Sequence, residues 1–171
     1  MTEEPPRIVA VGAHPDDIEL SMAGLLIRLA LQGHAVTWIV ASDGAAGNGG
    51  RDAGLAACRL GEARAGARYG GADLITLGLP DGQLAWIAGM DAAIGSHMAA
   101  LAPDLVVTHA LNDYHADHRA VARFVGDTLP IGVPLLRVDT MLGLHFVPDL
   151  LIDITEVFEA KLAALAWVLS N

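Results

Sequence analysis

The chain has 171 residues, of which 53% are hydrophobic and 18% charged, and twenty acidic residues against ten basic ones give a formal net charge of −10. This composition suits one globular domain, excludes a disordered chain, and argues against nucleic acid or an anionic membrane as a partner. No apolar run approaches the roughly 20 residues of a membrane span, and the first residues are acidic where a signal peptide is basic. We therefore expect a cytoplasmic protein, and Cys58 alone cannot form an intrachain disulfide.

Short apolar runs rich in Val and Ile alternate with longer segments of helical period, which predicts β-α units and a mostly parallel sheet. Strands are expected at residues 7–12, 35–41, 73–77 and 104–108, with weaker candidates at 134–142 and 149–152. Helices are expected at residues 19–32, 53–69, 90–101, 117–128 and 157–169. The predicted fold class is α/β, a Rossmann-like three-layer fold in a single domain spanning residues 1–171.

The first polar motif, His14-Pro15-Asp16-Asp17, lies at the corner between the first strand and the first helix. Asp16 or Asp17 could simply cap that helix, because an Asp side chain accepts hydrogen bonds from the free N–H groups of a helix start. One cap is enough for one helix, however. Two carboxylates beside an imidazole would be costly without a cation, so the motif favours a metal site over capping.

A second motif, His115-Ala116-Asp117-His118, follows the fourth predicted strand. Asp117 could again be a helix cap with exposed histidines on either side. The carboxyl ends of parallel strands lie at the same edge of a sheet, so the two motifs can converge there. With a single cysteine in the chain, a metal at that edge would have to be held by His, Asp and Glu side chains.

A glycine-rich stretch at residues 43–50 follows the second strand and invites comparison with phosphate-binding loops. The first strand leads into His-Pro-Asp-Asp instead of a G-x-G-x-x-G turn, and the chain has no Walker lysine, so a nucleotide-binding domain is disfavoured. The stretch is interpreted as a flexible surface loop or, beside a metal site, as a lid or substrate wall.

The two motifs in this order resemble the LmbE/PIG-L family of zinc-dependent N-acetyl-sugar deacetylases. Further segments match the family pattern: Arg59-Leu60-Gly61-Glu62 followed by Ala65, Leu77-Gly78-Leu79-Pro80-Asp81-Gly82, and Asp153-Ile154-Thr155 with Lys161. The resemblance covers almost the whole chain. It implies a hydrolase that removes the acetyl group from an N-acetylated amino sugar, such as an N-acetylglucosaminyl conjugate, by means of a metal-activated water.

The resemblance also implies the metal ligands and the base. His14, Asp17 and His118 would hold Zn²⁺ and leave a fourth position for water, as catalytic zinc sites do. Asp16 would take the proton of that water as general base.

Three further residues receive roles from the same resemblance. His115 would stabilise the tetrahedral oxygen and protonate the leaving amine, with Asp117 orienting its imidazole and favouring the charged form. Arg59 would contact the substrate, although a helix-surface ion pair with Glu62 is an equally good interpretation of that residue.

Several other polar residues near this edge are open to more than one interpretation. Glu19 is expected on the surface of the first helical turn, where acidic residues suit the helix dipole. Asp81 has turn chemistry, and by family resemblance it could also face the pocket. Any of four residues on the loop before the second motif could line the sugar pocket: His109, Asn112, Asp113 and Tyr114.

The chain departs from the family pattern near its end. Thirty-five positions (153 − 118) separate His118 from Asp153, fewer than is usual, and Trp167-Val168-Leu169 stand where many relatives carry a histidine. A compact or truncated member is implied, and the apolar end predicts a homo-oligomer. Two alternatives for the function stay open: an amidase that cleaves a larger N-acyl group from a sugar or thiol conjugate, and a non-catalytic relative that binds metal or carbohydrate. The carboxylate of Asp16 beside the metal favours an enzyme over the latter.

Overall fold

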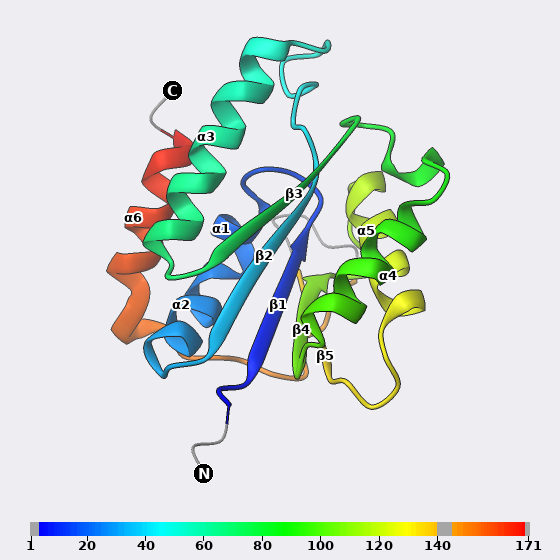
Figure 1. Cartoon of the computed structure of the whole chain (residues 1–171). Coiled ribbons are helices and arrows are strands. Elements are labelled where there is room, and N and C mark those ends of the chain that lie inside the picture. The colour runs from blue at the N-terminus through cyan, green and yellow to red at the C-terminus, as the bar shows by residue number, and fades with distance from the viewer. Residues whose placement is uncertain (1–3, 140–144, 170–171) are drawn as a thin grey trace.

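Five parallel strands form one sheet in the order β3-β2-β1-β4-β5, as the computed structural model shows for residues 4–139 and 145–169 (Figure 1). The strands are β1 (Arg7–Gly12), β2 (Ala35–Ser42), β3 (Asp73–Leu79), β4 (Leu105–His109) and β5 (Leu135–Val138). β1 lies at the centre, where Arg7 aligns with Ala35 of β2 and Ile8 aligns with Leu105 of β4. The prediction of a Rossmann-like α/β fold with a parallel sheet is confirmed.

Apolar side chains of β1 alternate between two hydrophobic cores, one on each face of the sheet. Ile8 and Ala10 belong to the first core, while Val9 and Val11 belong to the second. A central parallel strand is covered on both faces, which explains why its sequence is almost continuously apolar.

Helices cover both faces and complete three layers (Figure 1). On one face lie α1 (Asp17–Ser21), α2 (Ala23–Leu31), α3 (Ala53–Tyr69) and α6 (Phe158–Leu169), and on the other lie α4 (Met90–Leu101) and α5 (Ala116–Thr128). Two short 3₁₀ helices, η1 (Leu84–Trp86) and η2 (Thr155–Val157), join these elements.

The first predicted helix is in fact two helices. α1 ends at Ser21 and α2 begins at Ala23, with Met22 at φ −117° between them. The hydroxyl of Ser21 donates a hydrogen bond to the carbonyl of Asp17 at 2.6 Å. Such a bond from a serine to the preceding turn competes with the helical ladder and favours a bend.

The predicted strand at residues 149–152 is wrong, because this segment is irregular and Leu151 is 84% exposed. Apolar composition alone does not make a strand, since its backbone groups need a neighbour in the sheet. The other weak candidate becomes β5, and residues 140–142 of that predicted range lie outside the described residues.

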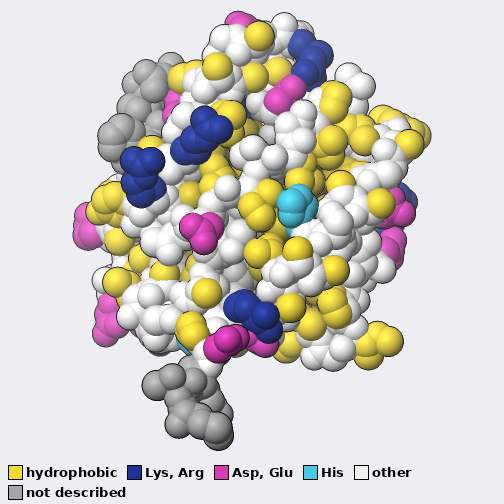
Figure 2. Space-filling model, in the orientation of Figure 1, with side chains coloured by type: hydrophobic (Ala, Val, Ile, Leu, Met, Phe, Trp, Pro, Cys, Tyr) yellow, Lys and Arg dark blue, Asp and Glu magenta, His cyan; other side chains and the backbone are white. Residues whose placement is uncertain are grey.

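No helix in the described ranges is long and apolar enough to cross a membrane. On the face shown in Figure 2, Lys and Arg side chains are scattered among hydrophobic and uncharged ones and form no continuous basic patch. The side chains of residues 167–169 lie outside the described part, so the homo-oligomer stays a prediction.

Candidate active site

The two sequence motifs meet at the carboxyl end of the sheet. The first follows β1 and the second opens α5 after β4, and these two strands are neighbours. The order β3-β2-β1-β4-β5 reverses direction between β1 and β4, and open α/β sheets bind ligands at such a switch point because the outgoing loops diverge there. A cavity of about 780 Å³ occupies this place, and His14, Asp17, His115 and His118 are among the residues that line it.

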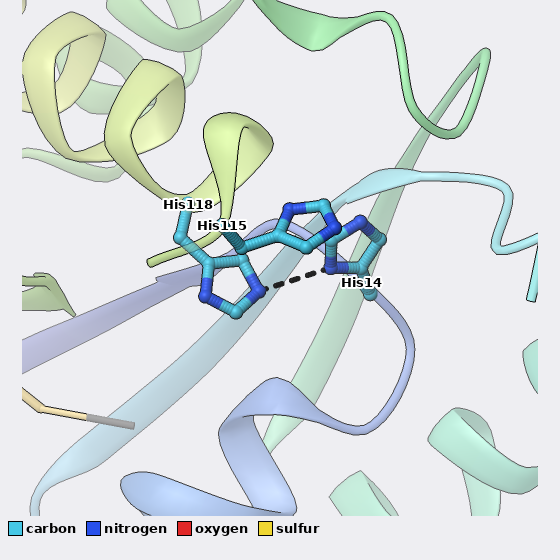
Figure 3. Close-up of side chains that lie close together, drawn as sticks. All are labelled: His14, His115 and His118. Atoms are coloured by element: carbon cyan, nitrogen blue, oxygen red, sulfur yellow. Dashed lines mark hydrogen bonds between the residues drawn. The ribbon is translucent and has the colours of Figure 1, made fainter. Parts of the chain in front are cut away.

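His14, Asp17 and His118 form a tight triangle of potential ligand atoms. Nδ1 of His14 lies 3.1 Å from Nε2 of His118 (Figure 3) and 3.4 Å from Oδ2 of Asp17. Nε2 of His118 lies 3.2 Å from Oδ1 of the same carboxylate. All three residues are buried, with exposed fractions of 8%, 6% and 4%.

This triangle fits a small divalent cation. Ligand atoms about 2.1 Å from a tetrahedral zinc ion lie about 3.4 Å from one another. The three measured separations are close to that value, and a cation would satisfy both imidazole nitrogens as acceptors. The described residues contain three overlapping groups with metal-binding potential: His14, His115 and His118; Asp17, His109 and His118; and His14, Asp81 and Asp117.

Carboxylates support both imidazoles from behind. Nε2 of His14 lies 3.1 Å from Oδ1 of Asp81 and 3.5 Å from Oδ2 of Asp117. Nδ1 of His118 lies 3.0 Å from Oδ1 of Asp113. A carboxylate on the outer nitrogen fixes the orientation of a metal-binding histidine and increases its basicity.

His109 at the end of β4 is fully buried against the same triangle. Its ring stacks on His118 at 4.0 Å, and its Nε2 lies 3.2 Å from Oδ2 of Asp17 and accepts the Ala13 N–H at 3.0 Å. From the sequence, His109 and Asp113 are among the residues that could line the sugar pocket. In the structure neither is among the residues that line the cavity. His109 contacts His118 and Asp17, and Asp113 contacts His118.

Burial and hydrogen bonds between the histidines and carboxylates shift the pKa values of the site in opposite directions. Burial alone would lower the pKa of His14, but hydrogen bonds with Asp117, Asp17 and Asp81 raise it to about 12. Burial alone would raise the pKa of Asp17, but hydrogen bonds with His109, His118 and His14 hold it well below its usual range. The hydrogen bond with His14 lowers the pKa of Asp81 to about 2. This negatively charged ring of carboxylates favours positive charge at its centre.

Asp16 stands beside the triangle with its carboxylate held by Arg59. Oδ2 of Asp16 lies 2.5 Å from Nη2 of Arg59, and the backbone of Asp16 has φ 156°, which is unusual outside glycine. Burial, followed by the charge of Asp17, raises the pKa of Asp16 to about 6, against the opposing effect of Arg59. Arg59 lines the cavity and its side chain is 17% exposed. The substrate contact and the ion pair with Glu62 both stay predictions.

His115 begins α5 and faces both other histidines, with ring centres 4.7 Å from His14 and 4.8 Å from His118. Its Nδ1 accepts the backbone N–H of Asp117 at 3.2 Å. Burial, and then the charges on His14 and His118, lower its pKa.

Asp117 contacts His115 through its backbone, while its carboxylate lies against the loop after β3. Its carboxylate accepts the backbone N–H groups of Gly82 at 2.8 Å and Leu84 at 3.1 Å, and lies 3.5 Å from His14. Its backbone N–H, not its carboxylate, meets the ring of His115. The negative charge of Asp117 does raise the pKa of His115, as expected, but burial outweighs it. Asp117 therefore anchors the loop after β3 and supports His14.

The expectation that Glu19 lies on the surface is wrong, because this residue is only 1% exposed. A Cβ added to Gly66 of α3 would lie 2.7 Å from its Oε1, so the side chain packs directly against that helix. Burial raises its pKa to about 8. The sequence did not reveal this burial, because acidic residues are common in the first turn of a helix, where the helix dipole favours them.

The glycine loop, residues 43–50, lies beside the cavity, and its residues Ala46 and Gly47 line the cavity. The N–H of Ala46 donates to Oδ2 of Asp81 at 2.9 Å. The loop therefore forms part of the cavity wall, in agreement with the interpretation as a wall and not with that of a surface loop away from the site. Asp139, directly after β5, also lines the cavity, and no motif in the sequence distinguishes it.

The fold and site together define a doubly wound α/β protein with a candidate metal centre at its switch point. Residues 9–129 match the family model of PIG-L, GlcNAc-PI de-N-acetylase, and the chain belongs to that family. This confirms the family resemblance and, with it, the enzyme class of an N-deacetylase.

Solved structures share the fold over nearly the whole chain. GalB, the 4-carboxy-2-hydroxymuconate hydratase of Pseudomonas putida, aligns with TM-score 0.88 and 21% identity over 95% of this chain and 78% of its own. The conserved protein TT1542 of Thermus thermophilus aligns with TM-score 0.83 and 25% identity over 95% and 78%. The N,N'-diacetylchitobiose deacetylase of Pyrococcus horikoshii aligns with TM-score 0.78 and 22% identity over 98% and 71%.

A hydratase thus shares the architecture with deacetylases, so the fold alone does not fix the reaction. No curated protein sequence matches the chain significantly.

Proposed function

We propose that this protein is a zinc-dependent hydrolase that removes the acetyl group from an N-acetylated amino sugar or its conjugate. The observation that carries the proposal is the triangle of His14, Asp17 and His118, with separations of 3.1, 3.4 and 3.2 Å, beside a carboxylate and a third imidazole in one cavity. Family membership supports the reaction class. The likeness to deacetylases of N,N'-diacetylchitobiose and of the A40926 pseudoaglycone supports the substrate class.

His14, Asp17 and His118 would hold the ion, with Asp81 and Asp113 fixing the two imidazoles through their outer nitrogens. A zinc ion at this place would supply Lewis acidity and would lower the pKa of a bound water to about 7. The remaining chemistry is the work of the chain's own side chains.

Asp16 is the proposed general base. Its carboxylate is ionised above about pH 6, so at neutral pH it can take a proton from water. Its contact with Arg59 keeps the carboxylate at the wall of the cavity.

His115 is the proposed partner of the developing oxygen. Its Nδ1 is already an acceptor for the Asp117 N–H, so the neutral ring carries its proton on Nε2. That N–H can stabilise negative charge on the tetrahedral oxygen. The proton that Asp16 takes from water can then pass to the leaving amine, so that Asp16 takes over the acid role that the resemblance implies for His115. Asp117 contributes by supporting His14 and by fixing the first turn of α5 through its own N–H.

The cavity, at about 780 Å³, is within the size range of small-molecule sites and admits a sugar residue. Arg59 lines it and is the proposed substrate contact for hydroxyl or anionic groups. The same volume also admits a longer acyl chain, which keeps the amidase as the second candidate function. We further propose that residues 1–171 act as one domain and that the protein works in the cytoplasm.

The test is product release from a matched pair of substrates, N-acetylglucosamine and an N-acyl glucosamine with a longer chain, with and without chelator. Acetate released from the first and lost on chelation supports the deacetylase. Preference for the longer acyl group would replace it with the amidase, and zinc binding without turnover of any N-acyl sugar would favour the non-catalytic relative.

A further inference from the structure

The glycine loop is tied to the candidate site at two separate points. The carbonyl of Gly44 accepts a hydrogen bond from Nη1 of Arg59 at 3.2 Å. Two residues later the N–H of Ala46 donates to Asp81, whose other oxygen lies 3.1 Å from His14. One short stretch of backbone is therefore linked both to the residue that holds Asp16 and to the residue that supports His14.

Arg59 is inserted between this loop and the first motif. Its Nη2 meets Asp16 at 2.5 Å while its Nη1 meets Gly44, so the two arms of one guanidinium bridge two segments. The planar fork suits such a double contact, whereas the single ammonium of a lysine does not span both partners.

The loop's glycines leave room for this arrangement. A Cβ on Gly44 would lie 2.9 Å from Cδ of Pro15 and 3.2 Å from Cδ of Arg59. A Cβ on Gly47 would lie 3.2 Å from Nη1 of Arg59. At Gly49, by contrast, a Cβ would meet nothing within 4 Å. The close approach is therefore specific to the part of the loop that faces Arg59.

We propose that Arg59 is a positioning residue, which locks the Asp16 carboxylate to the glycine loop and so fixes the direction in which the base points. The inference rests on the proposed function, because it takes Asp16 as the base. The backbone of Asp16 has a φ of 156°, which residues other than glycine rarely adopt. The hydrogen bond from Arg59 then fixes the direction of the carboxylate. A displacement of about 1 Å at a reacting group can cost about 10²-fold in rate.

Kinetics separate positioning from substrate contact. Arg59→Ala is expected to lower kcat by about 10²-fold, in addition to any rise in KM from the proposed substrate contact, whereas loss of a substrate contact alone raises KM and leaves kcat unchanged. Added guanidinium ion should restore part of the kcat of Arg59→Ala, and Arg59→Lys should not recover the full rate. Arg64→Ala, an exposed arginine on the same helix that does not line the cavity, is the matched control and should behave as wild type. A KM increase at unchanged kcat would overturn the proposal.

A glycine pair tests the loop side of the contact. Gly44 and Gly49 both have positive φ, +65° and +81°, so alanine causes backbone strain at both positions, but only at Gly44 does it press on Pro15 and Arg59. Gly44→Ala should lower kcat strongly and Gly49→Ala only slightly. The effects of Gly44→Ala and Arg59→Ala should not add in the double variant, because both break one contact. Fully additive effects would contradict a shared contact.

Hydrogen exchange of the metal-free protein gives a readout without turnover. Arg59→Ala should speed amide exchange in residues 44–47, and Arg64→Ala should not. If wild type hydrolyses no N-acyl sugar, the proposed function fails, yet the exchange rates still decide whether Arg59 holds the loop. Unchanged exchange in Arg59→Ala would overturn the inference even in an active enzyme.

Discussion

Nδ1 of His14 lies 3.1 Å from Nε2 of His118, although 104 positions separate the two residues in the chain. His14 lies in the loop after β1, and His118 lies in the first turn of α5. They meet because β1 and β4 are adjacent parallel strands, so that the loops leaving them share one edge of the sheet. The topology therefore brings together a candidate metal site from two short motifs, neither of which has enough ligands alone.

Asp16→Asn should keep the metal and lose turnover. The amide is isosteric with the carboxylate and can still accept a hydrogen bond from Arg59, but it cannot take a proton. We expect kcat to fall by about 10²- to 10⁴-fold, the range of general-base catalysis, with the zinc content unchanged. Normal turnover would show that Asp16 is not the base.

The pH dependence of the wild-type enzyme follows from the same residue. Burial and the charge of Asp17 raise the pKa of Asp16 to about 6, and the base works only when ionised. Activity should therefore fall as the pH drops through about 6, and a bound cation moves this limb to lower pH because it favours the carboxylate. A kcat/KM profile measured with fixed zinc checks this, and an acid limb well above pH 6 would contradict the assignment.

His115→Ala and His118→Ala are a matched pair within one turn of α5. The first should retain zinc and lose turnover, since His115 acts on the substrate, while the second should lose zinc as well. Metal content and turnover are measured on the same preparations. Zinc loss in His115→Ala with zinc retained in His118→Ala would mean that the two roles are interchanged.

Asp81→Asn tests the support of His14. The variant keeps the shape of the side chain but removes the charge 3.1 Å from Nε2. Loss of such an outer partner typically weakens metal affinity by about 10- to 100-fold, so competition with a chelator should show a shift of that order. Asp91→Asn changes an exposed carboxylate that does not line the cavity and serves as control. Equal affinities in Asp81→Asn and wild type would exclude the support role.

Glu19→Gln should stabilise the metal-free protein at alkaline pH. The pKa of Glu19 is raised from 4.5 to about 8 in the folded state, so its contribution to stability is present below about pH 4.5 and is lost as the pH rises through 8. Glutamine removes that pH dependence, and each kcal/mol gained raises Tm by about 2–4 °C. Melting curves at acid and alkaline pH measure it, with exposed Glu156→Gln as control. A Tm difference that is the same at both pH values would contradict burial of an ionisable carboxyl.

Much of the architecture could be predicted from the sequence, because its local signals are strong. The range predicted for the helix at 53–69 is the one observed, and four strands were placed to within two residues. The predictions from local sequence patterns were wrong where contacts between distant segments determine the secondary structure. Segment 149–152 is irregular and pairs with none of the described strands. Beside the break at Met22, the hydroxyl of Ser21 bonds to the carbonyl of Asp17.

In the site, too, some residues could be predicted from local motifs and others only from the folded structure. His14, Asp17 and His118 stand in motifs whose spacing is visible in the sequence, and the structure brings them together. Asp113 and His109 act behind this triangle, and no spacing rule distinguishes them from other polar loop residues. The carboxylate of Asp117 points to Gly82 and Leu84, a contact that depends on how the loop after β3 folds back.

The most direct test of the account is the metal content of the purified protein, measured by elemental mass spectrometry alongside acetate release from N-acetylglucosamine. The account predicts about one zinc per chain, as for a single three-ligand site, with turnover lost on chelation and restored by added zinc. A protein that binds no metal, and gains no activity when zinc is supplied, would contradict it.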